Sequence, residues 1–305
     1  MSTFLPGFAR HAPACVLSAC LALAVCAAPA GAALPETPAA AVLHARYAAL
    51  TWQFAHNQFQ RPLYLDSLES AGNLKGDIYA LVDYPFPRVS AVLQNPENWC
   101  DVLILHINTK YCGAATANAG TVLTLRIGKK VDQPIADAYR MEFAYRVAAA
   151  NPDYVAVRLD AGSGPLGTSD YRILIEMAPV EGDKTILHFT YAYSYGFAGR
   201  LAMQVYLATA GHSKVGFTLV GTQRNGQPDY VGGVRGVVER NTMRYFLAID
   251  AYLGALAAPP AERLDKRLQS WYTSTELYAL QLHDVGRKEY IDMKGREIRR
   301  QQSAQ

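Results

Sequence analysis

Charge is scarce in this chain, and the two signs nearly cancel. Charged residues make up 18% of its 305 residues, with 29 Lys and Arg against 26 Asp and Glu, whereas an average soluble domain has roughly 25%. No basic stripe stands out, so nucleic acid is not an expected partner. Acidic residues interleave even with the basic segment 287–300, which is therefore predicted to be a solvated helix.

The motifs of metal, nucleotide and hydrolytic chemistry are also missing. The histidines show no HxH or HExxH spacing, and the glycine-rich segment 162–168 is neither G-x-S-x-G nor a Walker loop. This segment lies between two predicted strands, where a hairpin turn is expected rather than a phosphate cradle, which normally opens a helix. No carboxylate pair of a glycosidase can be picked out. The sequence thus predicts no metal site and no cofactor, and it identifies no catalytic residue.

Long apolar runs are confined to the N-terminus. The first 33 residues contain no acid, and the run 12–28 ends in the small residues Ala-Pro-Ala-Gly-Ala-Ala. A membrane-spanning helix needs about 20 apolar residues, whereas a shorter run before an A-x-A site is typical of a secretory signal peptide. We therefore predict a signal peptide over residues 1–32, cleaved after Ala30 or Ala32, and a location in the periplasm or outside the cell. An uncleaved anchor is the alternative.

Leu17-Ser18-Ala19-Cys20 also matches a lipobox, which would place a lipid on Cys20. The apolar run continues beyond Cys20, where a mature lipoprotein should already be polar. We therefore favour a soluble product over a lipoprotein, also because stable anchoring takes a second signal.

Cysteine becomes rarer still once the signal peptide is removed. Cleavage leaves only Cys100 and Cys112 in the mature chain. In an oxidising compartment two cysteines joined by a short loop are predicted to form a disulfide, with two separate buried thiols as the alternative. The spacing is not C-x-x-C and there is no second pair, which argues against zinc.

Alternating apolar residues predict about seven antiparallel strands. Ala71-Gly72-Asn73 separates the first two, and turn residues such as Asn151-Pro152 separate the others. A sheet of this size must curl, which leaves a concave face to be filled. The predicted strands are 63–68, 74–82, 121–127, 139–147, 154–160, 171–177 and 185–195.

Helical spacing of apolar residues predicts the remaining elements. Segment 212–233 interrupts them as an inserted hairpin, with Asn225-Gly226 as its type I′ turn. The long segment 234–256 is the candidate to fill the concave face. The predicted helices are 40–59, 86–93, 97–105, 198–210, 234–256, 261–282 and 289–299.

The order of elements in residues 75–102 resembles that of a known protein family. A strand ends at Asp83-Tyr84-Pro85-Phe86-Pro87, and a short amphipathic helix then leads to Trp99. Together with the later strands and the helix 234–256, this order resembles the START-like (SRPBCC, helix-grip, polyketide cyclase-like) superfamily over residues 60–257. The resemblance implies an α+β fold in which a curved antiparallel sheet wraps on the long helix and encloses an apolar ligand. The predicted divisions are a signal peptide at 1–32, a helical segment at 33–59, the helix-grip domain at 60–257 and a helical extension at 258–305.

Aromatic residues occupy every second position of the last predicted strand, 185–195. Phe189, Tyr191, Tyr193 and Tyr195 share one face of the sheet. On the concave side they would form an aromatic wall for a flat or polycyclic molecule. Ordinary core packing beneath the long helix is the alternative. The residues predicted to bind the ligand are Tyr145, Phe189, Tyr191, Tyr193, Arg244 and Tyr245.

Charges at 235, 239, 240 and 244 cannot all lie on the solvent face of one helix, because neighbouring residues are about 100° apart around the axis. Glu239 either forms an ion pair with Arg235 that braces the end of the sheet, or lies at the pocket mouth. In the second case Glu239 or Arg244 would hold a carboxylate or hydroxyl of the ligand.

These features favour an exported protein that binds or carries an apolar small molecule, either a lipid or a polycyclic compound. A cyclase- or dehydratase-like enzyme is the first alternative, since the resembling superfamily includes such enzymes. The second is an envelope interaction module that docks through the added helices or the segment 212–233. Contact with a membrane surface and the oligomeric state are left open by the sequence.

Overall fold

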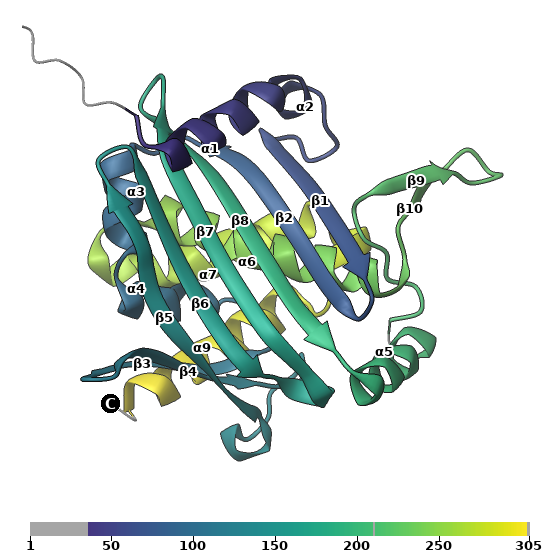
Figure 1. Cartoon of the computed structure of the whole chain (residues 1–305). Helices are drawn as coiled ribbons and strands as arrows, with labels where there is room; N and C mark the ends of the chain where they lie inside the picture. Colours follow the sequence, from purple (N-terminus) through teal and green to yellow (C-terminus); the bar gives the residue numbers. More distant parts are fainter. Residues whose placement is uncertain (1–35, 210, 304–305) are drawn as a thin grey trace, which may run out of the picture. The chain divides into compact units, whose positions relative to one another are not determined.

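An antiparallel sheet of eight strands forms the body of the computed structural model, which describes residues 36–209 and 211–303. The strands lie in the order β1-β2-β8-β7-β6-β5-β4-β3 (Figure 1). β3 to β8 therefore follow one another as neighbours, and the hairpin β1–β2 is added beside β8. The strands are β1 (Leu63–Ser70), β2 (Asn73–Val82), β3 (Thr109–Ala117), β4 (Gly120–Ile127), β5 (Tyr139–Asn151), β6 (Tyr154–Ser163), β7 (Thr168–Val180) and β8 (Lys184–Tyr195).

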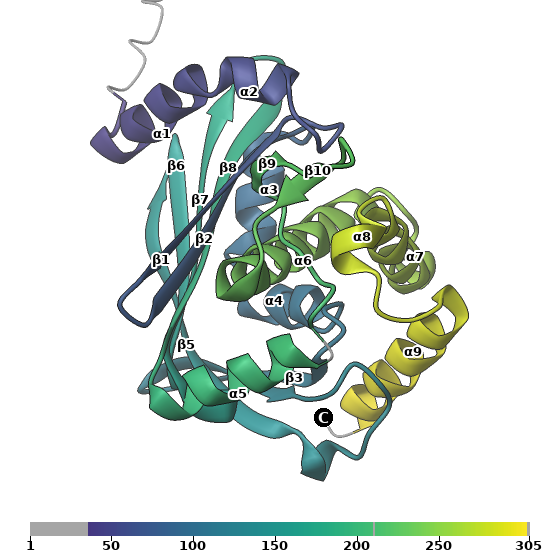
Figure 2. The same ribbon diagram turned by 90° about the vertical axis from the view of Figure 1, so that its right-hand side faces the viewer.

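Helices cover both faces of this sheet. α1 lies across one face, and α6 lies against the other with α7 beyond it (Figures 1 and 2). The main apolar core fills the space between the sheet and α6, and a smaller core lies under α1. The helices are α1 (Pro38–Ala49), α2 (Thr51–Ala55), α3 (Phe86–Leu93), α4 (Pro96–Leu103), α5 (Phe197–Ala208), α6 (Gly233–Ala255), α7 (Arg263–Glu276), α8 (Ala279–Leu282) and α9 (Arg287–Ser303), with 3-10 turns η1 (Ile135–Asp137), η2 (Pro165–Gly167) and η3 (Pro260–Glu262).

This arrangement is a helix grip, and the predicted α+β fold with its long C-terminal helix is confirmed. α6 contacts β2 so closely at Gly76 that an added Cβ would lie 2.2 Å from Oγ1 of Thr242. Glycine at this position is therefore what allows the helix to lie directly on the sheet.

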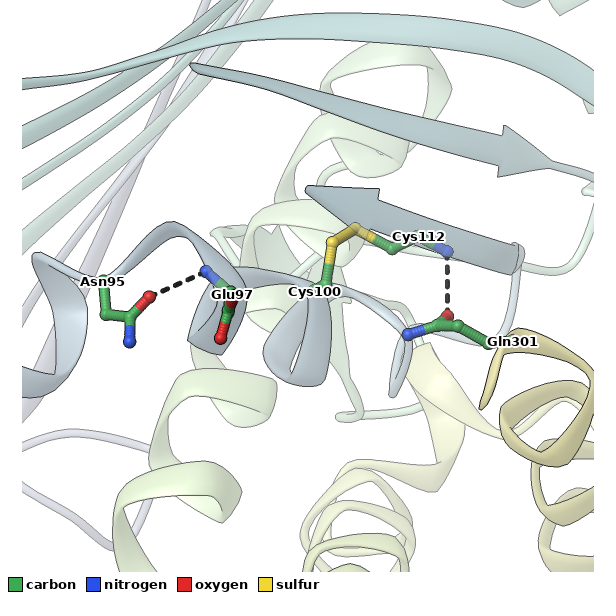
Figure 3. The surroundings of a disulfide bond; sticks show 5 residues. All are labelled: Asn95, Glu97, Cys100, Cys112 and Gln301. Carbon is green, nitrogen blue, oxygen red and sulfur yellow. Dashed lines mark hydrogen bonds between the residues drawn. A yellow bond between two sulfur atoms is a disulfide. The ribbon is translucent and has the colours of Figure 1, made fainter. Parts of the chain in front are cut away.

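The proline-guided turn after β2 starts two short helices that close one end of the core. Pro85 precedes α3, and the indole Nε1 of Trp99 in α4 donates to the carbonyl of Leu93 at 2.8 Å. A disulfide joins Cys100 of α4 to Cys112 of β3, with their Cα atoms 5.1 Å apart (Figure 3). The predicted pairing is thus present in the structure, and it ties the helical end to the edge strand.

Two predicted helices are divided in the structure: 40–59 corresponds to α1 and α2 and ends at Ala55, and 261–282 corresponds to η3, α7 and α8. Apart from such bounds, the structure differs from the sequence prediction at three places. β3 was missed because Thr109–Ala117 is rich in Ala and Gly, which carry little strand signal. The turn of the hairpin β9 (Leu219–Thr222) and β10 (Pro228–Tyr230) is not type I′. Its hydrogen bond runs from the amide of Gly226 to the carbonyl of Gln223, and a type I′ turn would need positive φ at both Asn225 and Gly226, whereas only Gly226 has it.

The third difference concerns α9, which is not a simple solvated helix. Lys294 and Glu297 are fully buried, and Glu297 binds both Lys294 at 2.8 Å and Lys110 of β3 at 3.0 Å. Lys294 also donates to the carbonyls of His106 and Thr109. The interleaved charges thus pair inside the protein, and they attach α9 to the edge of the sheet.

The described residues from Glu36 onwards cluster into one compact unit. The predicted boundaries at residues 60 and 257 stay predictions. The predicted signal peptide, its cleavage site and the lipobox Cys20 lie outside the described residues. Within the described part of the chain, no helix is both long and apolar enough to cross a membrane.

Candidate functional site

A cavity of about 260 Å³ lies between the end of the sheet, α6 and α5. Tyrosines of β7 and β8 form one wall, α6 contributes charged and polar side chains opposite them, and α5 adds small and apolar ones. The lining residues are Asn108, Lys130, Pro165, Leu166, Thr168, Tyr171, Tyr191, Tyr193, Gly199, Ala202, Met203, Val237, Arg240, Asn241 and Arg244.

A second cavity of about 150 Å³ continues this site deeper under α6. It shares five lining residues with the first and adds apolar ones from β4 and β5. Together the two fall within the roughly 300–1,000 Å³ of small-molecule pockets. The lining residues of the second are His106, Asn108, Ile127, Met141, Phe143, Pro165, Tyr171, Tyr191, Asn241 and Tyr245.

The aromatic wall is a connected set of rings. Tyr171 stacks on Tyr193 with centroids 5.1 Å apart and ring planes 13° apart, and Tyr191 lies 5.2 Å from Tyr245 of α6. Burial raises the pKa of Tyr171 to about 12 and raises that of Tyr191 well above its ordinary value. The phenols therefore stay protonated, and the wall is apolar in its body with neutral hydroxyls at its edges.

The opposite side of the first cavity is cationic. Arg240 and Arg244 project from successive turns of α6, and Lys130 comes from the loop after β4. Asp284 is shared by Lys130 at 2.6 Å and by Nη2 of Arg244 at 2.8 Å. Nη1 of Arg240 donates to the carbonyl of Val215 at 3.1 Å. One carboxylate is thus shared by two cations, and Arg240 lies one helical turn from Arg244.

Burial perturbs the ionisable groups at this side. It lowers the pKa of Lys130 to about 8, and the positive charge of Arg244 adds to this effect. Burial alone would raise the pKa of Asp284, but Arg244 and Lys130 outweigh it, so the pKa lies below its ordinary value. Asp284 is accordingly ionised, and Lys130 is the cation that changes charge nearest to neutral pH.

His106 borders the second cavity as a neutral imidazole. Burial, followed by the charge of Arg244, lowers its pKa well below the ordinary value. Its ring stacks on Tyr245 with centroids 4.6 Å apart, and Nδ1 accepts from the amide of Asn108 at 3.2 Å. Nε2 is buried and has no hydrogen-bond partner among the described residues.

The predicted site residues fall into two groups. Tyr191 lines both cavities, Tyr193 and Arg244 line the first, and Tyr245 lines the second. Two residues lie outside the lining. Phe189 is a buried core residue beside Tyr245, and the hydroxyl of Tyr145 donates to the carbonyl of Gln94 at 2.7 Å. Ligand binding by any of these residues stays a prediction.

Sequence reasoning missed several lining residues. Tyr171 lay in the predicted strand 171–177 but was not singled out, and Arg240 was recognised only as one charge among four. Lys130, Asn108 and His106 gave no signal, because each lies in a connecting segment whose place against α6 depends on the whole fold.

A second polar cluster lies on the opposite face of the sheet. His188 bridges Asp77 at 2.9 Å and Glu176 at 2.7 Å, and its ring stacks on Tyr79. His188 therefore points away from Tyr191 and is not available to the cavity. Within the described residues, no group of three or more His, Cys, Asp or Glu is arranged to hold a metal ion.

Comparisons with known proteins yield distant structural similarity alone. No family model matches the chain, and no curated protein matches it. Norcoclaurine synthase from Thalictrum flavum is 14% identical with a TM-score of 0.33 and covers 47% of this chain and 89% of its own. A conserved protein from Geobacillus kaustophilus is 14% identical, with a TM-score of 0.31 and coverages of 45% and 85%. CalU16 from Micromonospora echinospora is 12% identical, with a TM-score of 0.29 and coverages of 70% and 96%.

At these identities and TM-scores, the similarities carry no argument about ligand or reaction. The fold assignment rests on the strand order and on the position of α6.

Proposed function

We propose that this protein binds and carries a small, largely apolar molecule in the cavity between β7, β8 and α6, and that it does so in the periplasm or outside the cell. The observation that supports this most directly is the tyrosine wall of Tyr171, Tyr191 and Tyr193 around a cavity of about 260 Å³. Stacked aromatic rings with neutral hydroxyls suit a flat or polycyclic compound or a lipid chain.

Binding rather than conversion is the simpler use of these side chains. The cavity tyrosines are held protonated by burial, and Lys130 is paired with Asp284. A cyclase- or dehydratase-like activity is the competing function. Mass spectrometry of the compound that co-purifies from the native compartment, repeated after incubation with fresh protein, separates the two. Recovery of a changed mass would establish the enzyme and overturn the carrier.

The role of the tyrosine wall can be tested with an apolar fluorescent probe, N-phenyl-1-naphthylamine. Tyr193→Ala should weaken its binding roughly tenfold, because it removes a ring worth about 1.5 kcal/mol or more of contact. Tyr145→Ala is the matched control: it removes a buried tyrosine outside the cavity lining and should cost stability while leaving probe affinity unchanged. If Tyr193→Ala costs the roughly 3–5 kcal/mol of a core residue and leaves probe binding intact, the wall is only core and the carrier proposal fails.

A further inference from the structure

We infer that the molecule bound in this cavity is an amphiphile with one anionic group, and that Arg240, Arg244 and Lys130 hold this group while the tyrosine wall holds its apolar body. This inference rests on the proposed function and specifies its ligand class. A carboxylate, sulfonate or phosphate ester would fit the same cations.

The charge balance of the site supports an anion. Lys130, Arg240 and Arg244 line the cavity, and Lys214 lies close enough for Arg244 and Arg240 to lower its pKa in addition to burial. Asp284 is the carboxylate that both Lys130 and Arg244 contact. Because Lys130 and Arg244 share this one carboxylate, the three groups together keep a net positive charge beside the buried apolar wall. A buried charge without compensation is costly, so an incoming anion is strongly favoured there.

Hydrogen-bonding capacity at the site is also unused. Arg244 is 2% exposed, and its Nε is buried without a partner among the described residues. Buried donors of this kind are normally satisfied, because an unmet one costs about 1–3 kcal/mol. Nε itself is not exposed to the cavity, but Arg244 lines it, so the charge of its guanidinium attracts the anionic group of a ligand.

The shape of the site separates the two ends of the ligand. The cations lie on α6 and on the loop after β4, whereas Tyr171 and Tyr193 face them from the sheet and Met203 from α5. The second cavity continues from the tyrosines towards Met141 and Phe143 and brings no further cation. A bound amphiphile would therefore place its anionic group at Lys130 and Arg244 and extend its apolar body under α6.

Two probes with the same aromatic skeleton provide the test. 1-Anilinonaphthalene-8-sulfonate is N-phenyl-1-naphthylamine with one added sulfonate, so the ratio of their affinities isolates the anionic group. We expect the native protein to prefer the sulfonate. Lys130→Met should reduce sulfonate affinity roughly tenfold, as expected for one charge-assisted hydrogen bond, and leave the neutral probe unchanged. The side chain of Lys130 is 31% exposed, and Asp284 keeps Arg244 as its partner when Lys130 is replaced, so this variant should fold.

Lys129→Met is the matched control, since it removes the same charge from the adjacent, exposed residue. A pH series adds a second measurement. Asp284, Arg244 and Arg240 are the charged groups that act most strongly on Lys130, whose pKa of about 8 makes it lose its charge between pH 7 and 9. Lys294 also has a pKa of about 8 and the pKa of Lys214 is lowered, but neither lines the cavity, and both remain in Lys130→Met. Sulfonate affinity should fall over this interval in the native protein and in Lys129→Met, and not in Lys130→Met.

Equal affinity for both probes, or an equal loss of both in Lys130→Met, would overturn the anionic amphiphile while leaving the apolar carrier intact. Binding of neither probe would overturn the proposed function and this inference with it.

A separate observation concerns the outer face of α5, which we infer to be a docking surface for an anionic lipid bilayer. Phe197, Leu201 and Val205 follow one another at intervals of four, and Phe197 is 85% exposed. Leu166 of η2, also exposed, lies beside this helix. Exposed apolar side chains in such a row mark an interaction site.

The position and charge of this stripe favour a lipid surface. Gly199, Ala202 and Met203 on the other side of the same helix line the cavity, so an apolar ligand leaving past α5 would meet the bilayer directly. The chain has no Asp or Glu between Asp183 and Asp229, and Arg200 flanks the stripe. An amphipathic helix with basic flanks is suited to lie at an anionic interface.

Vesicle flotation tests this surface. The native protein should float with phosphatidylcholine vesicles that contain phosphatidylglycerol, and less with phosphatidylcholine alone. Phe197→Ser combined with Leu201→Ser should abolish flotation, whereas Val42→Ser, which changes an exposed apolar residue of α1, should not. Equal flotation of the double variant, no flotation of the native protein, or self-association that the double variant abolishes would each overturn the lipid surface.

Discussion

Glu239 shows how much a single buried carboxylate can organise. The sequence left it either as a brace at the sheet end or as a group at the pocket mouth. In the structure it is fully buried and accepts hydrogen bonds from Ser67 of β1 and from the amides of Phe217 and Thr218, with Arg235 at 4.0 Å. It is not among the residues that line the two cavities. The carboxylate therefore fastens the chain before β9 to the first hairpin.

The ion pairs of His188 with Asp77 and Glu176 should give the free energy of unfolding a maximum as a function of pH. Burial disfavours its charged form, but hydrogen bonds to Asp77 and Glu176 outweigh this and raise its pKa above 6.5. Its contribution is therefore complete below pH 6.5 and is lost as the pH rises through the folded pKa. Burial would raise the pKa values of both carboxylates, yet His188 and other donors lower them. Their contribution is lost as the pH falls through those lowered values.

Urea denaturation over a pH series measures this effect. His188→Gln should lower the free energy of unfolding by about 1–3 kcal/mol near pH 6 and flatten the decline on the alkaline side. The exposed His56→Gln serves as control and should leave the profile unchanged. A His188→Gln profile parallel to that of the native protein would show that the bridge does not titrate in this range.

At the scale of elements, the disulfide between α4 and β3 yields a direct stability prediction. The bond closes a loop with a sequence separation of 12, which corresponds to about 3 kcal/mol of chain entropy. Reduction should therefore lower the melting temperature by several degrees, roughly 2–4 °C for each kcal/mol in a chain of this size. A variant with Cys100→Ala and Cys112→Ala is the control, because reductant should not shift its melting temperature. Two thiols titratable in the non-reduced native protein would contradict the bond.

The elements that the sequence predicted are those with a strong local signal. β7 and β8 alternate regularly, and α6 has apolar residues at helical spacing, so their existence and order were correct. β3 was missed because its residues are small, and its strand state depends on pairing with β4. The burial of α9 was missed because Lys and Glu are usually surface residues, and nothing in the sequence near Lys294 and Glu297 shows that Lys110 lies beside them in the fold.

At the scale of the whole molecule, the sequence predicted the enclosing fold and four of the residues that line the two cavities, Tyr191, Tyr193, Arg244 and Tyr245. The aromatic wall follows from one strand, so Tyr191 and Tyr193 could be chosen from their period of two. Arg244 was also chosen, as a charge on the long helix. Lys130 and Asp284 could not be chosen, because they lie in segments far from Arg244 in the chain. These side chains come together only when the sheet packs around α6, so no local sequence pattern predicts the site.

The attachment of α9 to β3 also bears on the order in which the chain becomes native. Lys110, early in the sheet, has its carboxylate partner 187 positions later, at Glu297, and the amide of Cys112 is bonded by Gln301 (Figure 3). Until those last helical turns are present, a lysine in the core lacks its counter-charge, and removing one partner of such a pair typically costs about 3–5 kcal/mol. A chain that ends before α9 would leave Lys110 and the amide of Cys112 without these partners. We therefore expect it to be less stable than the full chain and more readily cleaved by a protease.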